Sequence, residues 1–144
     1  MFEEKHAVTH FRLGRLYLKQ GKFEKGETHL KKSIELEPEE PSYLETLGNE
    51  YERKGKIFDA LALLERVSIL QPDREEIYIR LGDLYRQKQY LQKAVSRYWS
   101  AVAINSENIY VHETLKEIFE ILTEKEKEKL ELLMQQSPVT TTHK

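Results

Sequence analysis

Three eight-residue stretches, HFRLGRLY (10–17), LETLGNEY (44–51) and YIRLGDLY (78–85), follow one another at a spacing of 34 residues. Each contains a Leu-Gly pair, and a tyrosine follows each glycine by three residues. A constant period in the range of about 20–50 residues indicates stacked supersecondary units. We therefore divide this part of the chain into repeats 7–40, 41–74 and 75–108.

Each repeat is predicted to form two helices joined by a turn. In the second repeat, both halves have the i, i+3, i+4, i+7 spacing of an amphipathic helix, at Leu44, Leu47, Gly48 and Tyr51, and at Ala60, Leu64, Val67 and Ser68. The glycine of Lys54-Gly55-Lys56 can adopt the positive φ of a turn between them. Because glycine is costly inside a helix, its recurrence at 14, 48 and 82 predicts close helix–helix approach.

The pattern Tyr78-x-x-Leu81-Gly82-x-x-Tyr85, followed by Ala94-x-x-x-Tyr98, resembles the tetratricopeptide repeat, and the second repeat has the same pattern through Pro72. The resemblance covers residues 7–108 in one register. It implies an all-α fold, a right-handed α-solenoid of three helix-turn-helix units.

Residues 109–136 resemble a degenerate fourth repeat. Leu115 and Phe119 keep the repeat spacing, but Lys116 stands in place of the glycine. Thr123 and Glu126 have the spacing of a capping box, which predicts that a second helix begins there. We therefore expect a C-terminal capping helix pair, a single domain over 1–136 and a disordered tail at 137–144.

The composition excludes several classes of protein. The 23 basic and 25 acidic residues nearly cancel, so the chain lacks the basic excess of a nucleic-acid-binding protein. There is no cysteine, and hence no thiolate zinc site. The acidic, polar N-terminus is unlike a signal peptide, and no apolar stretch predicts membrane insertion. These features favour a soluble cytoplasmic protein, or a soluble segment of a longer one.

The sequence gives little support for an enzyme. It has no cysteine nucleophile and no Gly-rich phosphate loop. The strongest metal candidate is His6 with His10, which share a helical face, but Ala7 stands where the zinc-protease motif has glutamate. We predict packed histidines, with no metal and no cofactor, and a metal-dependent enzyme remains the third hypothesis.

In the tetratricopeptide family, one face of the first helix of each unit lines a concave groove that holds a peptide. The resemblance implies that the groove is lined by Val8, Phe11, Arg12, Arg15, Leu18, Lys19, Glu45, Asn49, Glu52, Arg53, Glu76, Ile79, Arg80, Asp83, Arg86, Tyr110, Glu113 and Glu117. This set is basic at the first unit and acidic at the last. The gradient either orients a ligand or reflects chance in a highly charged chain.

One subclass of the family binds acidic C-terminal peptides of cytosolic chaperones through lysine, asparagine and arginine in the groove. The matching positions here are Phe11, Arg15, Thr46, Glu76 and Arg80. Only Arg80 fits, so we do not expect that ligand.

Two aromatic residues, Phe58 and Trp99, fall at positions expected to face outward. A second contact site, for self-association, is one interpretation of this pair, and local repacking is the favoured one. The favoured function is a protein–protein interaction module that binds a peptide or protein segment in its groove, as a scaffold, adaptor or assembly factor. The alternative is a dedicated chaperone for a secreted client.

Overall fold

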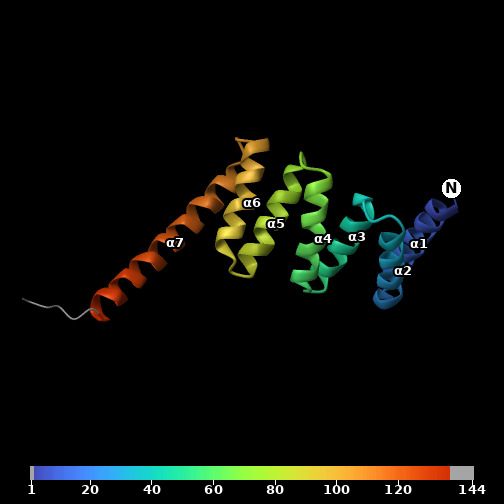
Figure 1. Ribbon diagram of the computed structural model, residues 1–144, viewed down its shortest axis with the longest axis horizontal. Helices are drawn as coiled ribbons and strands as arrows, with labels where there is room; N and C mark the ends of the chain where they lie inside the picture. The colour runs from blue at the N-terminus through green and yellow to red at the C-terminus, as the bar shows by residue number, and fades with distance from the viewer. Residues whose placement is uncertain (1, 137–144) are drawn as a thin grey trace, which may run out of the picture.

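The computed structural model describes residues 2–136, and side chains from residue 6 onward. The described chain is all α-helical, and Figure 1 shows its helices following one another in chain order along an elongated molecule. The helices are α1 (Phe2–Lys19), α2 (Phe23–Leu36), α3 (Pro41–Arg53), α4 (Ile57–Leu70), α5 (Glu75–Gln87), α6 (Leu91–Ile104) and α7 (Ile109–Gln136). The predicted fold class is confirmed.

Short turns join the two helices of each unit. Gly21 and Gly55 have φ values of 74° and 75°, in the left-handed region that glycine adopts without strain. At the third turn Gln89 has φ 65°. This left-handed conformation costs a residue with a β-carbon more free energy than it costs glycine. Pro38 and Pro72 lie two residues beyond the ends of α2 and α4, as expected of a residue that cannot continue a helix.

The repeated glycines bring paired helices together to different degrees. A β-carbon built on Gly82 would lie 2.6 Å from the ring of Tyr98, and one on Gly14 would lie 2.9 Å from Leu30. At Gly48 the nearest atoms, those of Leu64, lie at 3.5 Å, which is ordinary van der Waals contact. The prediction of close approach therefore holds at the first and third units and fails at the second.

The predicted capping helix pair is wrong, because residues 109–136 form the single helix α7 of 28 residues. Thr123 does not cap a new helix: its Oγ1 donates to the carbonyl oxygen of Phe119, four residues back in the same helix. No glycine or proline interrupts 109–136, so nothing in the local sequence ends the helix at Thr123. The expected tail at 137–144 lies outside the described residues.

Candidate peptide-binding face

The predicted groove residues lie on the first helices of the units, α1, α3 and α5, and on α7, and we call their shared surface the groove face. Between α3 and α5, Arg80 donates to Asn49 at 2.6 Å and to Glu52 at 2.8 Å. Arg74, just before α5, donates to both carboxylate oxygens of Glu45, at 2.7 and 3.1 Å. The middle of the groove face is thus a network of cross-helix ion pairs.

A second set of polar contacts joins α5 to α7. Arg86 pairs with Glu117 at 2.6 Å. Asp83 accepts hydrogen bonds from Tyr110 at 2.7 Å and from Tyr98, whose ring reaches past Gly82 from α6. Burial, followed by the bond to Asp83, raises the pKa values of Tyr98 and Tyr110 above the ordinary tyrosine value. Both phenols are therefore neutral donors near pH 7.

The α1 end of the groove face is different. The Phe11 ring packs on Tyr43 of α3, with centroids 4.7 Å apart, and the Arg15 guanidinium lies 5.6 Å from the Phe11 centroid. Arg12, Arg15 and Lys19 are all exposed. Within residues 6–136, no carboxylate lies within ion-pair distance of these three cations. Among residues 6–136, the positive charge of these three side chains is therefore uncompensated.

Sequence reasoning missed Arg74, which organises the α3–α5 contact. Besides Glu45 it contacts Glu76 at 2.7 Å, and the hydrogen bond from Arg74 is the main cause that lowers the pKa of the Glu76 carboxyl. Arg74 precedes α5, so a search confined to helix faces cannot find it. Its position just after a unit-ending proline is the only signal in the sequence.

Leu18 was placed in the groove incorrectly. A β-carbon on Gly26 of α2 would lie 2.7 Å from Leu18 Cδ2, so this side chain fills the interface between α1 and α2. The reason is helical spacing: Leu18 follows Gly14 by four residues and shares its face.

The other predicted groove residues differ in their surroundings. Ile79 is half-buried against the C-terminal part of the core, so only part of its apolar surface is free for a ligand. Arg53 pairs with Glu50 of its own helix. Val8 and Glu113 are exposed.

Of the two histidine candidates, His10 lies beside a histidine of α2. Nδ1 of His10 lies 2.9 Å from Nδ1 of His29 on α2, and Tyr17 stacks on His29. Burial, followed by the nearby His29, lowers the pKa of His10. Across the described part of the chain, no group of three or more histidine, cysteine or acidic residues has the arrangement needed to hold a metal ion.

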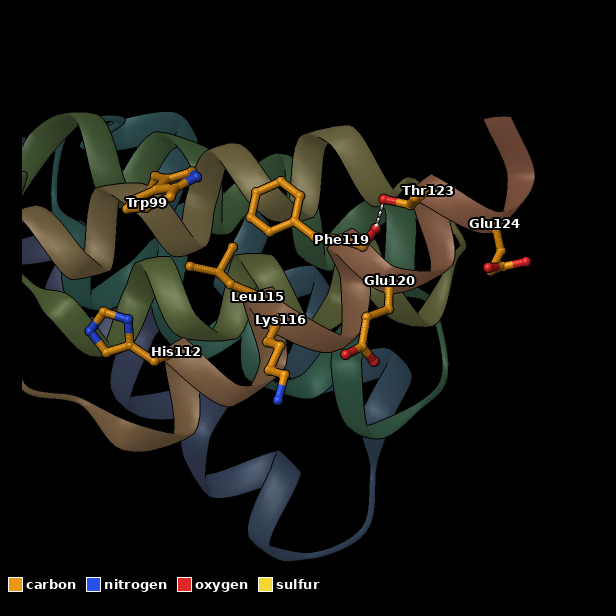
Figure 2. Close-up of a pocket in the computed structure, with 8 residues that line it drawn as sticks. All are labelled: Trp99, His112, Leu115, Lys116, Phe119, Glu120, Thr123 and Glu124. Carbon is orange, nitrogen blue, oxygen red and sulfur yellow. Dashed lines mark hydrogen bonds between the residues drawn. The ribbon is translucent and has the colours of Figure 1, made fainter. Parts of the chain in front are cut away.

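The two outer aromatic residues lie in separate surroundings. Phe58 on α4 is edge-on to Tyr90, with centroids 5.9 Å apart. Trp99 on α6 instead lines a hollow against α7 with Leu115 and Phe119 (Figure 2). Phe58 is therefore packed against another aromatic ring, whereas Trp99 borders a hollow.

Two family models match this chain, both of the tetratricopeptide repeat, over residues 7–40 and 76–107. The chain belongs to the tetratricopeptide repeat family, whose repeats form protein–protein interaction modules. Among curated proteins, Superkiller protein 3 of Schizosaccharomyces pombe is 28% identical over 110 residues. That match covers 76% of this chain and only 8% of the length of the relative.

Solved structures share the fold. The N-terminal domain of stress-induced protein-1 from C. elegans has a TM-score of 0.69 at 20% identity, over 81% of this chain and 96% of that one. The first TPR of Spaghetti (RPAP3), bound to HSP90 peptide SRMEEVD, scores 0.66 at 22% identity, over 83% and 95%. The MamA protein scores 0.72 at 23% identity, over 88% and 68%.

No helix within residues 2–136 has the length and apolar character needed to cross a lipid bilayer.

Proposed function

We propose that this protein binds an extended segment of another protein along the groove face, with acidic residues of that segment at α1. It acts as a scaffold, adaptor or assembly factor and performs no catalysis. One observation carries the proposal: Arg12, Arg15 and Lys19 have no carboxylate partner among residues 6–136, whereas Arg74, Arg80 and Arg86 do.

Uncompensated charge is what a ligand can use without first breaking an internal contact. A peptide carboxylate at Arg80 would compete with Glu52 and Asn49, whereas one at Arg12 gains an ion pair directly. Exposed pairs contribute only about 0.2–1 kcal/mol each. The α1 cations therefore act mainly on the association rate and the orientation of the ligand.

Phe11 supplies the apolar part of the same site. Its half-buried ring is held by Tyr43 on one side and lies near the Arg15 guanidinium. A ring fixed in this way loses little side-chain entropy when a ligand packs on it. The ion-paired middle of the face is unfavourable for a strongly apolar client, which disfavours a dedicated secretion chaperone.

The Spaghetti domain binds an acidic peptide, SRMEEVD. We expect acidic ligands here too, but not that peptide, because Phe11, Thr46 and Glu76 carry no positive charge at three of the five positions that match the subclass. Arg80, the one residue that fits its own position, is already paired with Glu52.

The test is selection from a library of random ten-residue peptides displayed on phage. Wild-type protein should enrich peptides rich in aspartate and glutamate. The double variant Arg12→Glu/Arg15→Glu should lose them. The matched control, Lys25→Glu/Lys32→Glu on α2, makes the same change in net charge away from the groove face and should retain them. Equal loss in both variants, or no acidic enrichment, would refute the proposal.

A further inference from the structure

In the described part of the chain, α7 is the last helix and has no partner helix within its own unit. In the third unit, the face of α5 that carries Gly82 is covered by Tyr98 of α6. The equivalent face of α7 carries Lys116 and borders a hollow of about 770 Å³, as Figure 2 shows. Within the described residues no helix follows α7. Over residues 2–136, the fourth unit therefore consists of one helix, where the preceding units have two.

Two aromatic residues of this hollow stand where the preceding unit has a hydrogen-bonded pair. Between the second and third units, Tyr85 donates to Glu65 at 2.9 Å. The residues 34 positions later are Phe119 and Trp99, which both line the hollow and are 43% and 48% exposed. A polar interface pair has become an aromatic pair that faces solvent. Exposed apolar clusters of this kind mark interaction sites.

The apolar surface continues along α7. This helix has 28 residues, against 13 in α5, so about half of it extends beyond the helix pairs, as Figure 1 shows. A second hollow, which shares Phe119 with the first, is lined on this part by Leu122, Leu130 and Met134. Phe119, Thr123, Glu126 and Leu130 lie on one face of α7, which we call the seam; it is apolar at its two ends and polar in the middle.

We propose that this surface of α7 is an interface between two copies of the chain, which pair antiparallel along α7. An antiparallel alignment that places Phe119 opposite Leu130 of the second copy also places Leu130 opposite the second Phe119. The same alignment brings Glu120 close to Lys127 of the second copy, and Lys127 close to the second Glu120. The midpoints of the Phe119–Leu130 pair and of the Glu120–Lys127 pair both fall between residues 123 and 125. One two-fold axis that passes near this point therefore brings both pairs together.

Two-fold symmetry makes this arrangement natural for the fold. A two-fold axis perpendicular to α7 uses the same patch on both copies and places the two helices antiparallel, which is also the relative orientation of the two helices within an αα-hairpin. Lys116 hinders close approach near the first hollow, and the contact is accordingly centred further along α7. The seam lies on a different side of α7 from Tyr110, Glu113 and Glu117, so the groove face stays open and the inference is independent of the proposed function.

The first experiment is sedimentation equilibrium of the full chain from roughly 10 to 500 µM, since a small interface is expected to be weak. Wild type should pass from monomer to dimer. Leu130→Glu should weaken dimerisation by roughly tenfold or more, since it introduces a charge into a desolvated contact. Leu132→Glu is the matched control, because both leucines are about half exposed but Leu132 lies on the opposite face. A wild type that stays monomeric, or two variants with equal effects, would overturn the proposal.

A charge exchange tests the antiparallel register itself. Glu120→Lys and Lys127→Glu should each dimerise more weakly than wild type, because each alone places like charges opposite one another. Mixed together, the two variants form a heterodimer in which both facing pairs are attractive. The mixture should therefore associate more strongly than either variant alone. A mixture that only averages the two separate affinities would rule out this register.

Discussion

The ring of Tyr98 occupies the space that a β-carbon at residue 82 would need, at a distance of 2.6 Å. A β-carbon at the equivalent Gly48 would lie 3.5 Å from the side chain of Leu64. The same glycine of the repeat is thus required by packing in the third unit and dispensable in the second. The two sites therefore predict opposite effects of one substitution.

Gly82→Ala should destabilise the protein, whereas Gly48→Ala should leave it unchanged or stabilise it. Alanine gains about 0.5–1 kcal/mol over glycine inside a helix. At residue 82, overpacking against the buried Tyr98 ring costs about 1–3 kcal/mol and outweighs that gain. Chemical denaturation of both variants measures the difference. Equal midpoints for the two would show that Tyr98 moves aside freely.

Gln89→Gly should stabilise the protein by about 1 kcal/mol. Gln89 is exposed and has φ 65°, and a left-handed conformation costs a residue with a β-carbon roughly 1–2 kcal/mol, part of which the greater chain entropy of glycine offsets. The control is Gln87→Gly, at the end of α5, which should destabilise. A decrease in the denaturation midpoint of Gln89→Gly would contradict the strain argument.

Acidification should destabilise the α1–α2 pair through His10. Because its pKa is lowered in the folded state, chiefly by burial and then by His29, protons bind the unfolded chain more readily. The stabilisation is complete above the unfolded pKa of about 6.5 and is lost as the pH falls below it. His10→Gln should lose less stability than wild type between pH 7.5 and 5.5. Parallel pH profiles for the two proteins would exclude His10 as the cause.

The groove face should respond differently to charge and to apolar changes. With an acidic peptide selected as above, Arg12→Glu/Arg15→Glu should slow association, most strongly at low salt. Phe11→Ala should instead speed dissociation, because an apolar anchor holds the bound state. Surface plasmon resonance at two salt concentrations separates the two rates, and a thermal melt checks that the loss of the Tyr43 contact leaves the fold intact. An association rate that is insensitive to Arg12 and Arg15 would mean that the gradient is only a solvated surface.

The fold could be predicted because its signals are local and repeated. The Leu-Gly pairs spaced by 34 residues predicted where each helix pair lies. Gly55 predicted a turn within a pair, and Pro38 and Pro72 predicted where the units end. The continuous α7 could not be predicted from Thr123 and Glu126, because a capping box at the surface competes with the i−4 hydrogen bond that Thr123 makes inside a helix.

The candidate site was predicted in outline only. Helical spacing placed Arg80 and Glu52 on one face, where they meet at 2.8 Å. It could not reveal that Phe11 packs on Tyr43, or that Arg74 reaches Glu45, since these contacts depend on how neighbouring units are rotated against each other. Leu18 was assigned to the wrong face for the same reason. Its position on α1 lies between the groove face and the face that meets α2, and only the packing of α1 on α2 decides between them.

The central claim is that an acidic segment binds at the α1 end of the groove face. Its most direct test is to follow backbone amide chemical shifts of isotope-labelled protein during titration with the selected acidic peptide. We predict that the largest changes fall on α1 and α3, around Phe11, Arg15 and Glu45, and that α2 and α4 change little. Changes concentrated on α7 around Phe119, or on the outer helices, would contradict the claim.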